Sequence, residues 1–241
     1  MTYSLTGIAY FTLFLALGFL TFRFFQYWKQ KKDITSRTFL FLGASFALFA
    51  LVRVVSVLFF AHNLKVLTYS IIAVAFIESL AAAIVGYLIL HLKFPRISPW
   101  LGFVFIMALG IAATVMTANI QYQPTLGEMG VFDWGFPSSG SDIPYSILRM
   151  AIILVTFFPL IIIMFQQFLR SEDSFLRRRS LGLSLMFLLA IFLGLIDFIL
   201  NNLLDLGVAV YRDYTTILIS FLIFVIILLT QKPRASEIKT I

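Results

Sequence analysis

Long, almost uninterrupted runs of hydrophobic residues fill this sequence, and short polar segments separate them. A helix that crosses the hydrocarbon core of a bilayer needs about 20 predominantly apolar residues. Seven runs fit this requirement, at residues 5–27, 38–60, 68–92, 99–117, 143–169, 181–201 and 215–230. The pattern therefore predicts an all-α protein, in which residues 1–241 form a single bundle of seven transmembrane helices.

The composition points the same way. The 241 residues are 61% hydrophobic and 12% charged, whereas a soluble domain carries about 25% charged residues. Such a chain has too little polar surface to face water all round, so we expect an integral membrane protein in contact with the lipid bilayer. The net charge of +7 is then interpreted as a membrane-orientation signal rather than a sign of nucleic-acid binding.

The distribution of basic residues predicts the orientation, because cytoplasmic segments are enriched in Lys and Arg. The predicted outer segments contain two basic residues, Lys65 and Arg212. The predicted inner segments contain Lys29, Lys31, Lys32, Arg37, Lys93, Arg96, Arg170, Arg177, Arg178, Arg179, Lys232, Arg234 and Lys239. We therefore expect the N-terminus outside and the C-terminus inside, in an inner or plasma membrane.

Four ionisable residues lie within the predicted spans: Arg53, Glu78, Arg149 and Asp197. At a rise of about 1.5 Å per residue, all four fall about 6–15 Å below the outer ends of their spans. A lone charge at the centre of a membrane costs about 2.5–3.5 kcal/mol on insertion scales. Pairing lowers this cost, so we expect Arg53 to pair with Glu78 and Arg149 with Asp197, each couple on consecutive spans.

Two interpretations of these four charges remain open. They can form a structural clamp that fixes the register of the helices, or they can line a polar site, open to the outside, for a small ligand, an ion or a proton. Spacing places Glu78 on the same helical stripe as Ala82 and Gly86. Because small residues favour close helix packing in membranes, we expect Glu78 to point into the bundle.

Two loops carry further candidates. The outer loop LGEMGVFDWGFPSSGSD, at residues 126–142, contains Phe132, Trp134 and Phe136. These aromatic side chains either form a lid over the polar site or, the interpretation we favour, belong to the aromatic belt at the lipid headgroups. The inner loop RSEDSFLRRRS, at residues 170–180, is expected to meet anionic headgroups; docking of a cytoplasmic or membrane protein is the alternative.

Several classes of protein are disfavoured by what the spans lack. The last span has no lysine for a retinal Schiff base, and the third ends in LHLKF rather than in the motif of rhodopsin-like receptors. His62 and His91 lie near opposite membrane surfaces and cannot share a haem iron. Asp197 is the only aspartate within a span, and the chain has no cysteine. We therefore expect no enzymatic activity, no cofactor and no metal site.

Three stretches, RTFLFLGASFALFALVR, YLILHLKFPRISPW and RRRSLGLSL, resemble those of uncharacterised seven-span bacterial membrane proteins. More loosely, the layout is similar to the seven-transmembrane sensor regions of bacterial histidine kinases, although the chain has no kinase module. The resemblance implies a sensor-like or accessory membrane protein and transfers no binding residue. The alternatives are a small proton- or cation-coupled transporter and a structural subunit of a membrane complex.

Overall fold

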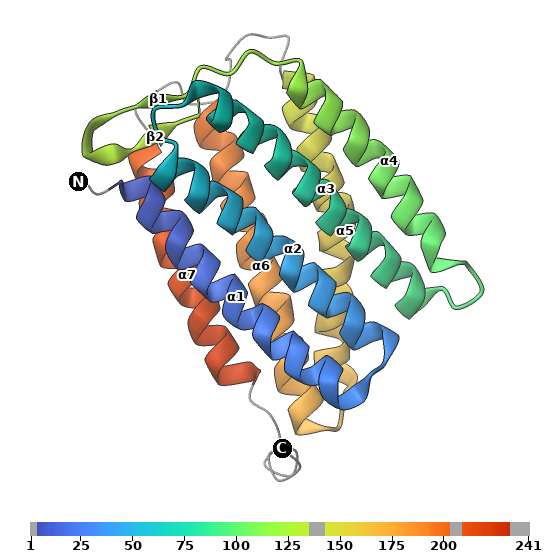
Figure 1. The fold of residues 1–241 in the computed structure, drawn as a ribbon. Helices are drawn as coiled ribbons and strands as arrows, with labels where there is room; N and C mark the ends of the chain where they lie inside the picture. The colour runs from blue at the N-terminus through green and yellow to red at the C-terminus, as the bar shows by residue number, and fades with distance from the viewer. Residues whose placement is uncertain (1–3, 135–142, 203–208, 232–241) are drawn as a thin grey trace.

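The structure, a computed structural model, describes residues 4–134, 143–202 and 209–231, with the side chains of residues 143–146 and 197–202 left out. Within these ranges lie seven helices long and apolar enough to cross a membrane, arranged as an all-α bundle (Figure 1). They are α1 (Leu5–Lys31), α2 (Ile34–Phe59), α3 (Leu64–Lys93), α4 (Pro99–Ala118), α5 (Ile143–Arg170), α6 (Ser174–Asn202) and α7 (Ala209–Thr230). The chain is an integral membrane protein.

A small hairpin lies between α4 and α5. Strand β1 (Thr125–Leu126) pairs antiparallel with β2 (Phe132–Asp133), and a short 3₁₀ turn, η1 (Glu128–Gly130), joins them. The hairpin covers the end of the bundle where α1 and α7 begin (Figure 1). We call this end the hairpin end, and the opposite end, which carries Lys29, Lys93 and Arg170, the basic end.

Several helices begin earlier than the hydrophobic runs predict. Asp33 accepts a hydrogen bond from the backbone N–H of Ser36 at 2.6 Å, and Asn63 accepts one from Val66 at 3.2 Å. These N-caps satisfy backbone donors that the first turn of a helix leaves free. The helices therefore extend through polar turns before the apolar run starts, and α7 begins at Ala209 rather than at residue 215.

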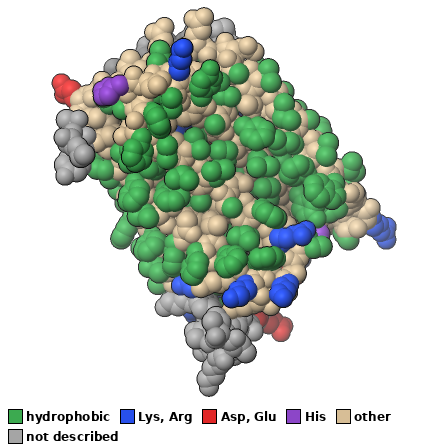
Figure 2. Space-filling model, viewed as in Figure 1, with side chains coloured by type: hydrophobic (Ala, Val, Ile, Leu, Met, Phe, Trp, Pro, Cys, Tyr) green, Lys and Arg blue, Asp and Glu red, His purple; other side chains and the backbone are tan. Residues whose placement is uncertain are grey.

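Six helices form a closed ring: α1 contacts α2 and α7, α2 contacts α3, α3 contacts α5, α5 contacts α6, and α6 contacts α7. Helix α4 packs outside this ring, against α3 and α5. The outer surfaces of the helices are broadly hydrophobic, as Figure 2 shows for one face, and the Lys and Arg side chains in that view lie mostly towards the basic end. This distribution suits a bundle surrounded by lipid.

The contact between α3 and α4 is unusually close, because glycines and a serine face each other. A Cβ added at Gly102 would lie 2.6 Å from the backbone oxygen of Gly86, and one added at Gly110 would lie 2.4 Å from the Cβ of Ser79. The Ser79 hydroxyl also lies 3.1 Å from the carbonyl oxygen of Gly110, to which it can donate. Small residues allow such an approach in lipid, where the hydrophobic effect does not drive helices together.

We predict that Gly102→Ala lowers the free energy of unfolding by about 1–3 kcal/mol, because the added methyl group meets backbone that cannot rotate away. Thermal unfolding of the purified protein in detergent measures this change. Gly18→Ala is the matched control: a Cβ at Gly18 has nothing within 4 Å, so helix propensity should leave the control unchanged or stabilise it by up to about 1 kcal/mol. Equal stability of the two variants would contradict the close contact.

Candidate functional site

One ion pair connects two of the four ionisable residues expected within the spans. Glu78 on α3 forms a salt bridge with Arg149 on α5, and Nε of Arg149 donates to Oε2 of Glu78 at 2.7 Å. The two side chains are 22% and 24% exposed. Glu78 thus points towards α5, and the pair is largely but not completely enclosed by the helices.

A small pocket adjoins this ion pair at the junction of α3, α4 and α5. Its remaining lining consists of small and aliphatic side chains: Ala75, Ser79, Ala113, Ile152 and Ile153. The space is about that of a single water molecule. The pocket therefore suits a proton, a water molecule or a small ion, and a larger ligand would require the helices to separate.

The expected pairing of Arg53 with Glu78 is wrong, and the reason is depth. Helix α3 begins at Leu64, which places Glu78 about 21 Å below that end, whereas Arg53 lies about 9 Å below the end of α2. Arg149 lies about 9 Å below the start of α5, and the bridge to Glu78 therefore shows that α3 extends beyond α5 at the hairpin end. The prediction began this span at residue 68, four residues inside the observed helix, and therefore placed Glu78 about 6 Å too close to its outer end.

Arg53 instead lies beneath the hairpin. Its guanidinium carbon is 4.0 Å from the centroid of the Trp134 ring and 6.0 Å from that of Tyr10, and the side chain is 4% exposed. The face of an indole ring attracts a cation, and most strongly where water is excluded. The side chain of Asp197, which we predicted to pair with Arg149, lies outside the described residues. The Arg149–Asp197 pair therefore stays a prediction.

The aromatic residues of the outer loop are buried rather than interfacial. Phe132 and Trp134 are each 1% exposed, and they pack against Val57, Leu67 and Ile71. The aromatic belt that we favoured for these two residues is therefore wrong. They close the hairpin end of the bundle, while Phe136, the third residue of the predicted lid, lies outside the described residues.

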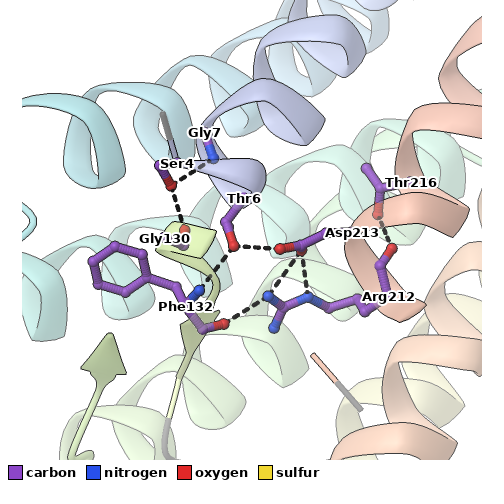
Figure 3. Close-up of polar contacts among 8 residues, drawn as sticks. All are labelled: Ser4, Thr6, Gly7, Gly130, Phe132, Arg212, Asp213 and Thr216. Carbon is purple, nitrogen blue, oxygen red and sulfur yellow. Dashed lines mark hydrogen bonds and ion pairs between the residues drawn. The ribbon is translucent and has the colours of Figure 1, made fainter. Parts of the chain in front are cut away.

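A second charged pair escaped the sequence analysis. Arg212 and Asp213, near the start of α7, are 2% and 1% exposed and form a salt bridge of 2.9 Å. Asp213 also accepts from the Thr6 hydroxyl on α1, and Nη2 of Arg212 donates to the backbone oxygen of Phe132 at 2.6 Å (Figure 3). The hydrophobic run begins after these residues, which were therefore assigned to an outer loop.

The basic end has its own polar cluster. Arg179, counted among the charges facing the headgroups, lies with its guanidinium 3.4 Å from the centroid of Tyr27 and 3.3 Å from the side-chain oxygen of Gln231. The Tyr27 hydroxyl donates to the backbone oxygen of Gln231 at 3.0 Å. These contacts join α1, α6 and the residue that follows α7.

Among the described residues, no group of three or more His, Cys, Asp or Glu side chains is placed to hold a metal ion. A comparison of the sequence with protein-family models and with curated proteins finds no match in either. The resemblance to seven-span sensor regions therefore stays a prediction.

We predict that Glu78→Gln and Arg149→Gln each destabilise the protein by about 1–3 kcal/mol, because each leaves a charge largely enclosed in the membrane-spanning part of the bundle. The double variant should lose less than the sum of the two single changes. Unfolding in detergent measures all four proteins. Strict additivity would show that the two side chains contribute independently.

We predict that Asp213→Asn destabilises the protein by about 3–5 kcal/mol, because it removes the negative partner of a buried arginine without changing the side-chain shape. The same unfolding assay measures the loss. Glu128→Gln is the control, since Glu128 is an exposed acid on the hairpin, at the same end of the bundle, and should change stability by less than about 0.5 kcal/mol. An effect of Asp213→Asn as small as that of the control would contradict the role of the buried pair.

Proposed function

We propose that this integral membrane protein is a non-enzymatic, sensor-like or accessory component, and that the Glu78–Arg149 pair is its input. The observation that carries the proposal is the pair itself: two opposite charges bridge α3 and α5, in the membrane-spanning part of the bundle, beside a pocket of about the size of a water molecule. On this proposal the hairpin end faces outwards and receives the stimulus.

An ion pair between two helices suits a sensor because it has two distinct states. When both groups are charged, each offsets the cost of enclosing the other in the membrane. Protonation of Glu78, or competition by a small ion, would remove that compensation and favour a state in which Arg149 gains access to water. A stimulus can shift such an equilibrium only by its difference in binding free energy between the two states.

The route to the basic end supports the same proposal. Helices α3 and α5, which the pair joins, meet again at Lys93, whose ammonium group donates to the side-chain oxygen of Gln166 at 3.0 Å. The loop that leaves α3 at this end carries the exposed Arg96, and α5 ends there at the exposed Arg170. A shift between α3 and α5 would therefore alter the surface that a cytoplasmic partner is expected to meet.

A small proton- or cation-coupled carrier is the second candidate. The observation that favours it is the position of Glu78, a carboxylate with room for a water molecule beside it within the membrane-spanning bundle. Intramembrane carboxylates commonly take part in proton relays. In this case Glu78 would exchange its proton between the two sides, and flux rather than binding would be the output.

We predict that Glu78→Gln, which mimics the protonated acid, changes the distance between α3 and α5 at the basic end. The chain has no cysteine, so Arg96→Cys in the loop after α3 and Arg170→Cys at the end of α5 provide unique sites for spin labels. Double electron–electron resonance in lipid nanodiscs should show a shifted distance distribution in the Glu78→Gln protein. The Glu128→Gln protein, with the same labels, should give the same distance distribution as the labelled protein in which Glu78 is unchanged.

Unchanged distances in the Glu78→Gln protein would contradict the sensor proposal. The carrier is tested separately, in proteoliposomes that enclose a pH-sensitive dye. Proton uptake driven by an imposed gradient, lost in Glu78→Gln but kept in Glu128→Gln, would favour the carrier over the sensor.

A further inference from the structure

The hairpin between α4 and α5 presents two different faces. We call residues 125–134 the strap. The two strands pair Leu126 with Phe132 and Thr125 with Asp133, and the backbone N–H of Gly127 donates to the oxygen of Val131 at 2.8 Å. Phe132 and Trp134 point into the bundle, while Asp133 between them is exposed. The strap thus offers the bundle an extended backbone with two aromatic side chains two residues apart.

The helices hold the backbone of the strap through side-chain groups. The N–H of Phe132 donates to the Thr6 hydroxyl at 2.9 Å, and its oxygen accepts from Nη2 of Arg212 at 2.6 Å. The Ser4 hydroxyl donates to the backbone oxygen of Gly130 at 2.6 Å. These contacts come from the start of α1 and the start of α7 (Figure 3). None of them depends on the side chains of the strap.

The aromatic side chains enter a separate part of the same site. Val57, Leu67 and Ile71 surround Phe132 and Trp134, and the guanidinium of Arg53 covers the Trp134 ring at 4.0 Å. Proteins that bind extended peptides combine these two elements: main-chain hydrogen bonds give affinity, and pockets for alternate side chains give specificity.

The groups that hold the strap are oriented by the helices themselves. Asp213 accepts from the Thr6 hydroxyl and forms the salt bridge with Arg212, so one carboxylate fixes both of the side chains that contact Phe132. The Arg212 backbone oxygen in turn accepts from the Thr216 hydroxyl at 2.9 Å within α7. A site arranged by α1 and α7 can persist when the strap leaves it.

We propose that the hairpin end of the bundle is a binding site for an extended peptide with an aromatic–x–aromatic pattern, and that the strap is its built-in, autoinhibitory occupant. An external segment with this pattern would replace the strap, with its backbone on Thr6 and Arg212 and its second aromatic ring under Arg53. The proposal does not use the Glu78–Arg149 pair, and it can fail or succeed independently of the sensor proposal.

On this proposal, the strap competes with any free peptide for the site at the hairpin end. A tethered segment competes at an effective concentration in the millimolar range, so a free peptide should bind the unaltered protein weakly. Truncation of the two aromatic side chains of the strap should relieve this competition, because the Thr6 and Arg212 contacts alone hold the strap less firmly. Binding of a free peptide should then strengthen.

The first experiment uses the full chain in nanodiscs and a fluorescein-labelled peptide, GEMGVFDW, the sequence of residues 127–134. Fluorescence anisotropy should show that the Phe132→Ala/Trp134→Ala protein binds this peptide at least about tenfold more tightly than the unaltered protein does. The control peptide GEMGVADA should bind neither. A variant that retains a cooperative melt but binds GEMGVFDW no more tightly than GEMGVADA would overturn the proposal.

A second experiment leaves the strap intact, in case the truncated protein fails to fold. The chain has three tryptophans, so Trp28→Phe/Trp100→Phe leaves Trp134 as the only one. Because Trp134 is 1% exposed, acrylamide should quench its fluorescence weakly. A saturating concentration of the tryptophan-free peptide GEMGVFDF should raise the quenching constant as Trp134 leaves the site. An unchanged constant would show that the strap is a permanent plug and would overturn the proposal.

Discussion

The compensation of charge inside the bundle is the constraint on which the rest of this structure depends. A hydrocarbon environment cannot solvate an ion, so each intramembrane charge needs a nearby group that lowers its energy. Glu78 and Arg149 neutralise each other between α3 and α5, and Arg212 and Asp213 do so within α7. Arg53 lies over the electron-rich face of Trp134. The Glu78–Arg149 and Arg53–Trp134 contacts join segments that are far apart in the sequence, and the Arg212–Asp213 pair does so through its hydrogen bonds with Thr6 and Phe132.

Helices α1 and α7 are joined by polar contacts at both ends: Thr6 donates to Asp213 at the hairpin end, and Tyr27 donates to the backbone of Gln231 at the basic end. Phe19 and Phe224 pack together between them. This side of the ring is therefore a frame, and the strap is attached to it through Phe132.

The sequence predicts the fold class and the number of spans, because a run of about 20 apolar residues has few other uses in a chain of this composition. It does not predict the ion pairs. Whether Glu78 meets Arg53 or Arg149 depends on how far α3 protrudes beyond its neighbours, and hydrophobic patterns contain no information on relative helix height. The Arg212–Asp213 pair was missed for a related reason: its contacts lie on Thr6 and Phe132, which are remote in sequence. Alternation at 132–134, with aromatics flanking an acid, was the one local sign that the loop has a buried face.

Helix α4 is the element best placed to respond when the Glu78–Arg149 pair changes. It lies outside the ring and packs on α3 and α5, and its Ala113 lines the pocket beside the ion pair. Its contact with α3 rests on closely packed small residues and on the hydrogen bond from the Ser79 hydroxyl to the Gly110 backbone, so α4 should move together with α3. If the pair opens, α3 and α4 together can shift relative to α5 while α1 and α7 remain joined at both ends. The loops after α3 and α5 would then move relative to a fixed C-terminal end of α7, and this relative movement is what a partner at the basic end could detect.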